Sequence, residues 1–160
     1  MSAMFMSSAW AAAVGAALEA GPDDHARAQK LPEYWDFYGL VRSEYQSSWA
    51  LGVRGLPAAL GGGVRYLLVA WGANHVTECR VLDESEPVAA TYALTADYDD
   101  WRALINGYDA LRTVMYRKLL LDDGPLLEFF KAIYFFVESL ALIGAVPTRF
   151  PADAQVLARA

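Results

Sequence analysis

The feature that most constrains the fold is a long apolar segment near the C-terminal end, residues 126–146. Only Glu128, Lys131 and Glu138 carry charge within it. At about 100° per residue, these three side chains fall within about 80° of one another, so a helix here would have one narrow polar stripe. A helix that packs on a single sheet needs an apolar arc of little more than ~100°. This helix therefore carries more apolar surface than one packing contact can bury.

Three arrangements would bury the rest of that surface. The helix can lie at the centre of the core, it can bury its second side in a homodimer, or it can line a ligand cavity. The side away from the charges is expected to face the interior, and it carries Phe130, Ile133, Val137 and Leu140. The segment is long enough for a membrane span, but its three charges favour a helix embedded in a soluble protein.

The composition points to apolar rather than polyanionic partners. A chain of 160 residues has the usual size of one domain, so we expect a single domain over residues 1–160. Hydrophobic residues make up 56% of it, with 5 Trp, 9 Tyr and 7 Phe, which indicates either a generous core or a core that faces a cavity. The net charge of −6 argues against nucleic acid, which needs a basic face, and against electrostatic attraction to anionic lipid headgroups.

Two further observations concern the compartment. The single Cys79 cannot form an internal disulfide, which fits a reducing compartment. Residues 1–20 lack a basic start and include Glu19, so they are expected to be a helix of the mature protein rather than a signal peptide. We therefore expect a cytoplasmic protein.

The first half of the chain predicts a helix followed by strands. Ser7 or Ser8 can cap a helix over residues 9–20, whereas residues 23–48 have no clear period and are expected to be mostly helical or irregular. Alternating patterns and turn signals then predict four strands, at residues 49–54, 64–71, 75–82 and 88–95. Short polar links between them favour an antiparallel meander with one buried face.

The second half returns to helical spacing. Asp97 can cap a helix whose apolar face would carry Trp101, Leu104, Ile105 and Tyr108. A second short helix over residues 109–118 would present Leu111, Val114 and Met115 on one side. Residues 119–121 suit a fifth strand, and the apolar helix then begins at Pro125.

The sequence carries no recognisable catalytic or metal-binding motif. His25 and His75 are the only histidines, and on a strand His75 and Cys79 would lie about 13 Å apart, too far for a shared zinc site or a thiolate–imidazole pair. The acidic clusters lie at predicted helix starts, where capping and the helix dipole account for them. We therefore expect no catalytic residue, no metal and no cofactor.

Four stretches of the chain resemble the sterol-carrier-protein family of lipid-transfer domains. The segment FMSSAW at residues 5–10 is similar to the start of that family, and TADYDDW at residues 95–101 to its step from strand to helix. INGYDA at residues 105–110 resembles its glycine–helix link, and YRKLLLDDG at residues 116–124 its lysine–leucine strand before the final helix. The chain departs from the family at Arg117, where glycine is usual, at the final glycine, which comes one residue later, and over residues 34–45, which have no counterpart.

The resemblance implies an α+β fold: a five-stranded, mostly antiparallel sheet with helices on one face and an apolar C-terminal helix over a hydrophobic tunnel. Members of the family bind sterols, fatty acids or fatty-acyl-CoA without transforming them, which implies non-catalytic binding and transfer of an apolar ligand such as a fatty acid, an acyl group or a sterol-like lipid. A transient contact with a membrane or a partner enzyme would accompany transfer. The expected ligand-binding residues are Trp101, Leu104, Ile105, Tyr108, Met115, Phe130, Ile133, Tyr134, Val137 and Leu140.

Two other functions compete with this one. A small α+β enzyme of the cone-shaped kind, an isomerase or cyclase of apolar molecules, would need an ionisable group in its pocket, and the candidates are His75, Asp97 and Glu138. Cone-shaped folds end in strands, however, whereas this chain is expected to end in a long helix. The third function is an interaction module whose apolar helix packs into a homodimer.

Overall fold

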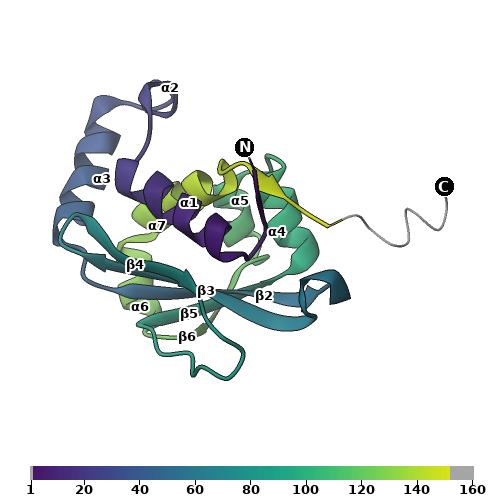
Figure 1. Cartoon of the computed structure of the whole chain (residues 1–160). Helices are drawn as coiled ribbons and strands as arrows, with labels where there is room; N and C mark the ends of the chain where they lie inside the picture. The colour runs from purple at the N-terminus through teal and green to yellow at the C-terminus, as the bar shows by residue number, and fades with distance from the viewer. Residues whose placement is uncertain (1, 152–160) are drawn as a thin grey trace.

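The computed structural model describes residues 2–151. It is an α+β domain in which helices pack on one face of a five-stranded mixed sheet (Figure 1). The strands lie in the order β4-β3-β2-β5-β6, and a second, two-stranded sheet joins β1 to β7. This architecture confirms the predicted fold class.

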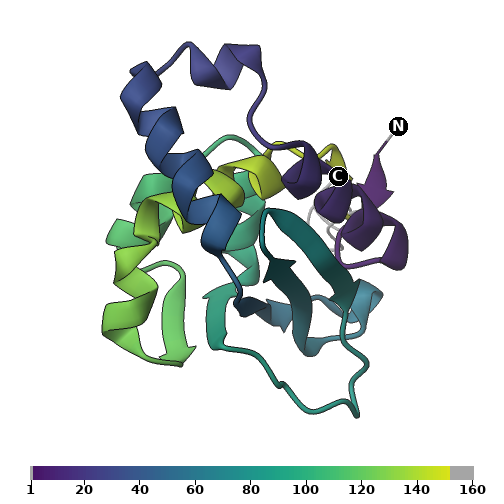
Figure 2. The same ribbon diagram turned by 90° about the vertical axis from the view of Figure 1, so that its left-hand side faces the viewer.

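The N-terminal elements lie over the sheet. Strand β1 (Ala3–Met4) pairs in parallel with β7 (Thr148–Arg149) and ties the two ends of the domain together. Helix α1 (Ser8–Ala20) starts as predicted, because the Ser7 hydroxyl accepts a hydrogen bond from the Trp10 amide at 3.1 Å. After the short α2 (Asp24–Arg27), the aromatic segment forms a regular helix, α3 (Pro32–Glu44), which crosses α7 (Figure 2).

The sheet begins as the predicted antiparallel meander of β2 (Ser48–Leu56), β3 (Gly63–Gly72) and β4 (His75–Val81). The prediction that the fourth strand continues this meander is wrong. Strand β5 (Tyr92–Asp97) starts four residues later than expected and pairs in parallel with β2, with Trp49 opposite Tyr92. The link over residues 82–91 passes beneath the sheet (Figure 1). Ten extended residues can reach about 33 Å, which exceeds the ~14 Å of three strand spacings.

Helices and a last strand follow in the predicted order. Helix α4 (Tyr98–Ile105) and helix α5 (Ala110–Met115) precede β6 (Leu120–Asp123), which pairs antiparallel with β5. Asp109 caps α5 by accepting a hydrogen bond from the Arg112 amide at 2.9 Å. Asp97 occupies the N-cap position of α4, but its carboxylate pairs with Arg54 at 3.1 Å instead of capping.

The apolar segment is two helices rather than the single helix expected. Helix α6 (Leu126–Lys131) ends at Ala132, whose φ of −112° and ψ of 26° are not helical, and α7 (Ile133–Gly144) starts immediately after it. The break turns Phe130 away from the interior, and its side chain is 44% exposed. The prediction that Phe130 faces the interior together with Ile133, Val137 and Leu140 is therefore wrong for Phe130 and confirmed for the other three, which are buried.

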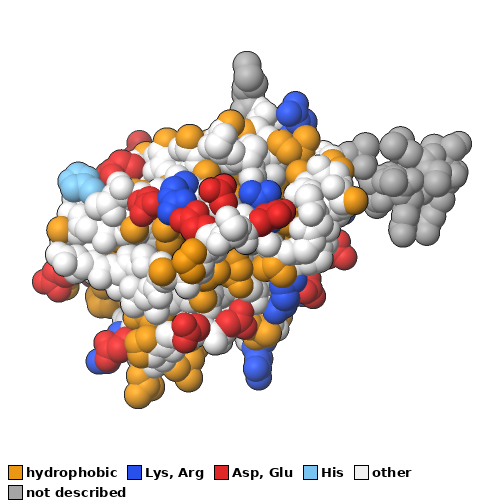
Figure 3. Space-filling model, turned by 60° about the horizontal axis from the view of Figure 1, so that its bottom comes forward, with side chains coloured by type: hydrophobic (Ala, Val, Ile, Leu, Met, Phe, Trp, Pro, Cys, Tyr) orange, Lys and Arg blue, Asp and Glu red, His pale blue; other side chains and the backbone are white. Residues whose placement is uncertain are grey.

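The core under α7 is built from aromatic rings. The ring centroids of Trp49 and Phe136 lie 4.9 Å apart, and those of Trp71 and Phe135 lie 5.0 Å apart. On the opposite face of the sheet the Tyr66 ring lies over Gly52, where a Cβ would come within 2.6 Å of the ring. Figure 3 views the molecule from this lower side and shows hydrophobic side chains interspersed with charged ones. None of the helices within residues 2–151 is long and apolar enough to span a membrane.

Candidate functional site

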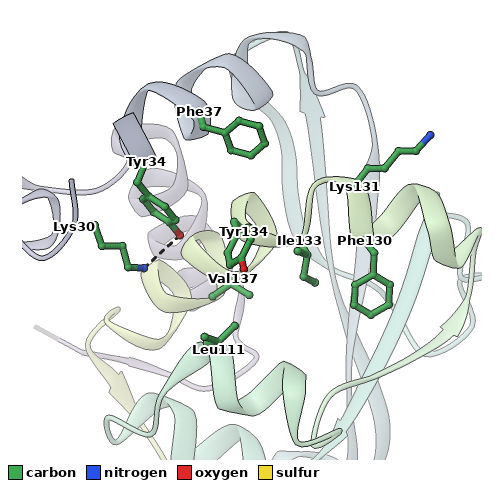
Figure 4. A pocket seen from close by; sticks show the side chains of 9 residues that line it. All are labelled: Lys30, Tyr34, Phe37, Leu111, Phe130, Lys131, Ile133, Tyr134 and Val137. Carbon is green, nitrogen blue, oxygen red and sulfur yellow. Dashed lines mark hydrogen bonds between the residues drawn. The ribbon is translucent and has the colours of Figure 1, made fainter. Parts of the chain in front are cut away.

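An apolar depression lies between α3, α5, α6 and α7 and is here called the first groove (Figure 4). Its volume is about 700 Å³, within the ~300–1,000 Å³ typical of small-molecule sites. It is lined by Lys30, Tyr34, Phe37, Leu111, Phe130, Lys131, Ile133, Tyr134 and Val137. Helix α3 supplies one wall, α5 supplies Leu111 opposite it, and α7 supplies the floor (Figure 4).

Aromatic side chains on the walls of the first groove are exposed to solvent. Phe37 is 47% exposed, Phe130 44% and Tyr134 48%. Helix α3 divides its aromatic residues between two faces, because Trp35 and Tyr38 are buried while Phe37 faces the groove. Clustered exposed apolar side chains in a concave site are typical of a surface that a ligand or partner covers.

The charged groups around the first groove are already paired. The Lys30 ammonium lies 2.6 Å from a Glu138 carboxylate oxygen, and the Tyr34 hydroxyl donates to the same oxygen at 2.5 Å. Burial and then this hydrogen bond to Glu138 raise the pKa of Tyr34, so the phenol stays protonated and keeps donating. Lys131 pairs with Glu128 at 3.0 Å. The first groove therefore presents apolar walls and no unpaired charge.

Phe130 also lines a second groove, of about 450 Å³, bounded by β5, β6, α5 and α6. Its walls are mostly aliphatic and aromatic, and its lining residues are Leu94, Val114, Met115, Arg117, Leu119, Leu120, Leu121, Asp122, Leu126, Phe129 and Phe130. The two grooves thus share Phe130, which projects from α6 at one end of the first groove (Figure 4).

The structure places eight of the ten predicted ligand-binding residues around the two grooves and one small void. Four line the first groove: Phe130, Ile133, Tyr134 and Val137. Met115 and Phe130 line the second groove. Three are buried around a void too small for water: Trp101, Leu104 and Leu140. Ile105 and Tyr108 line neither groove.

Sequence reasoning missed the wall that α3 contributes. Tyr34 and Phe37 belong to an aromatic cluster that stands out in the sequence, but the absence of a clear period left the segment without an assigned face. Lys30 and Leu111 were missed as well. Tyr34 and Phe37 are three residues apart, and this spacing is the one signal that would have placed both on the same side of a helix.

The candidate catalytic groups lie outside both grooves. His75 is exposed and pairs with Glu19 at 3.1 Å, and Asp97 is exposed beside Arg54. Glu138 is held by Lys30 and Tyr34. Burial raises the pKa of the Cys79 thiol to about 12. Within residues 2–151, no group of three or more His, Cys, Asp or Glu side chains is placed to hold a metal ion.

Compared by sequence, the chain matches no family model and no curated protein. Solved structures do match it. A crystal structure of sterol carrier protein 2 superposes with a TM-score of 0.68 at 18% identity and covers 89% of this chain and 98% of that one. A solution structure of a conserved hypothetical protein from Thermus thermophilus gives a TM-score of 0.67 at 19% identity and covers 95% and 96% of the two chains. This chain therefore has the fold of sterol carrier protein 2, as its sequence motifs predicted.

Proposed function

We propose that this chain binds an apolar ligand in the first groove and transfers it without changing it covalently. The ligand is a fatty acid, a fatty-acyl group or a sterol-like lipid. The observation that carries the proposal is the groove itself. It is a depression of about 700 Å³ in which Phe37, Phe130 and Tyr134 are each nearly half exposed. A ligand lying there would be flanked by α3, α5 and α7, so the hydrophobic tunnel of the family would be open along one side in this chain.

The energetics of burial suit such a ligand. Each methylene moved out of water gains about 0.8 kcal/mol, so ten buried methylenes gain about 8 kcal/mol before the cost of association is subtracted. Because Lys30 and Lys131 are both neutralised by carboxylates, the first groove offers little electrostatic attraction of its own. The fold supports the same function by analogy, since a structure that this chain resembles is named a carrier protein.

The enzyme alternative has less support. An isomerase or cyclase needs an ionisable group inside its pocket. His75, Asp97 and Glu138 line neither groove, and of the three only Glu138 lines a further depression, of about 440 Å³, between α1, α2 and α7. The carboxylate of Glu138 is already engaged, because it pairs with the Lys30 ammonium and accepts a hydrogen bond from the Tyr34 hydroxyl. A homodimer that covers the first groove remains the competing interaction module.

The direct test is native mass spectrometry of freshly purified protein, followed by lipid extraction. We expect a monomer carrying one co-purified lipid that is released intact by organic solvent. A bare dimer would support the interaction module instead and would contradict the carrier. A co-purified molecule recovered in two chemical forms, interconverted on incubation with the protein, would contradict non-catalytic binding.

A further inference from the structure

The second groove contains a residue whose backbone conformation is unusual for its type. Arg117 follows α5 and has a φ of 59°, in the left-handed region that favours glycine. Its amide hydrogen-bonds the Val114 carbonyl at 3.2 Å, so the position is the turn that ends the helix. Glycine would occupy such a turn without steric cost. An arginine there costs conformational energy, and Arg117 is among the residues that line the second groove.

The charge of Arg117 has no partner among residues 2–151. Its side chain is exposed and makes no hydrogen bond or ion pair with any residue between 2 and 151. The neighbouring Lys118 pairs with Asp100 at 3.5 Å. Arg117 is therefore the one cation lining the second groove, and its guanidinium is available to a ligand.

Asp122, the acidic residue in the lining of the second groove, directs its carboxylate toward Thr95. Leu121 pairs with Leu94, and both side chains point to the helix side of the sheet, so the next residue along β6, Asp122, points to the other side. There Asp122 accepts a hydrogen bond from the Thr95 hydroxyl, which itself accepts one from Arg54. The carboxylate thus belongs to a polar network with Thr95 and Arg54, and the other charged residue in the lining of the second groove is Arg117.

The two grooves therefore differ in charge and share one side chain. In the first groove each lysine has a carboxylate partner, whereas the lining of the second groove includes Arg117, which has no such partner among residues 2–151. Phe130 lines both grooves and is 44% exposed, so its ring is not fixed in the core. This arrangement suits a molecule that is apolar at one end and negatively charged at the other.

We infer that the chain binds a single-chain amphiphile with an anionic head. The tail lies in the first groove, the chain passes Phe130, and a carboxylate or phosphate head in the second groove accepts hydrogen bonds from the Arg117 guanidinium. Arg117 is thus a residue that determines specificity for an anionic over a neutral amphiphile. The inference rests on the proposed function and adds to it the class and the direction of the ligand.

The test uses delipidated full-length protein loaded with a fluorescent polyene fatty acid, displaced by three competitors of equal chain length: hexadecanoate, hexadecyl phosphate and hexadecanol. In Arg117→Gly the charge is lost while glycine suits the positive φ, so the variant is expected to fold. Removing a charged hydrogen-bond partner should weaken hexadecanoate and hexadecyl phosphate about tenfold and leave hexadecanol unchanged. Arg117→Lys should restore most of the affinity for the two anions.

Arg112→Ala is the matched control, because Arg112 is an exposed arginine on α5 that lines neither groove. It should leave all three competitors unchanged. The role of Arg117 would be overturned if Arg117→Gly lost affinity equally for the anions and the alcohol, or lost none for either. It would also be overturned if Arg112→Ala lost as much affinity for the anions as Arg117→Gly. A parent protein that binds hexadecanol and hexadecanoate equally would overturn this inference and leave the carrier proposal standing. A parent that binds none of the four molecules would overturn the carrier proposal itself.

Discussion

Phe130 is the residue at which the expected and observed arrangements differ most. Periodicity placed it on the buried side of one long helix, but the break at Ala132 leaves its ring 44% exposed between two grooves. Phe135, five residues later, is fully buried and stacks against Trp71, Tyr38 and Tyr45. Two phenylalanines so close in the sequence thus have opposite roles, one in the solid core and one on the groove wall.

This contrast gives a stability prediction. Phe135→Ala should cost about 3–5 kcal/mol of unfolding free energy, because it removes transfer energy and leaves a cavity in a packed core. Phe130→Ala should cost about half of that or less, since its ring already meets solvent on one side. Denaturant unfolding of the two delipidated variants measures both values. Equal losses would mean that Phe130 is packed as tightly as a core residue and that the grooves do not meet there.

Helix α3 is the element that supplies a wall of the candidate site. Its buried face, with Trp35 and Tyr38, holds it on α7, and its other aromatic residues form one wall of the first groove. A cluster of Lys30, Tyr34 and Glu138 fixes the start of the helix beside that wall. The motifs that resemble the sterol-carrier family do not include this segment. The wall that α3 supplies is therefore a departure from the family pattern, and it changes the candidate site.

A pair of substitutions on α3 separates binding from stability. Phe37→Ala removes a ring that lines the first groove, whereas Leu40→Ala removes an exposed side chain of the same helix that lines neither groove. We expect Phe37→Ala to weaken binding of a fluorescent fatty acid about tenfold, because the apolar contact that is lost is worth roughly 1–2 kcal/mol. Leu40→Ala should leave binding unchanged, and both should alter stability little. Equal effects on binding would mean that α3 does not form a wall of the site.

The sequence predicts the elements better than their connections. Alternation and capping residues indicate α1, β2, β3, β4, α4 and α5 close to their observed bounds, because those patterns reflect local burial. The break at Ala132 has no such sign, since alanine is the best helix former and neither glycine nor proline stands nearby. Tertiary packing accounts for the break: the Phe129 ring packs edge-on against Tyr92, with centroids 5.2 Å apart, and against Phe136, with centroids 4.9 Å apart. These contacts hold α6 against β5.

At the scale of the whole molecule, the parallel pairing of β5 with β2 brings the site together. It places β6, α5 and α6 beside the sheet edge and forms the second groove, and α7 then returns under α3 to form the first. Neither groove could be predicted from periodicity, which identifies a buried face but not which segments lie opposite it. The family resemblance supplied the five-stranded sheet with helices on one face but not the parallel pairing of β5 with β2. Of the site residues it implied on α7, Ile133, Tyr134 and Val137 line the first groove and Leu140 is buried, whereas those on α4 are buried or lie elsewhere.

The measurement that tests the central claim most directly is titration of delipidated Ile133→Trp and parent protein with the same fluorescent fatty acid. Ile133 lies in the floor of the first groove (Figure 4), so an indole there should fill the ligand's place. Because the groove has room for it, the unfolding free energy should fall by less than the ~1–3 kcal/mol that overpacking a solid core costs. We expect the parent to bind one equivalent of the probe and the variant to bind it at least about tenfold more weakly. A folded variant that binds the probe as tightly as the parent would contradict the claim that the first groove is the lipid site.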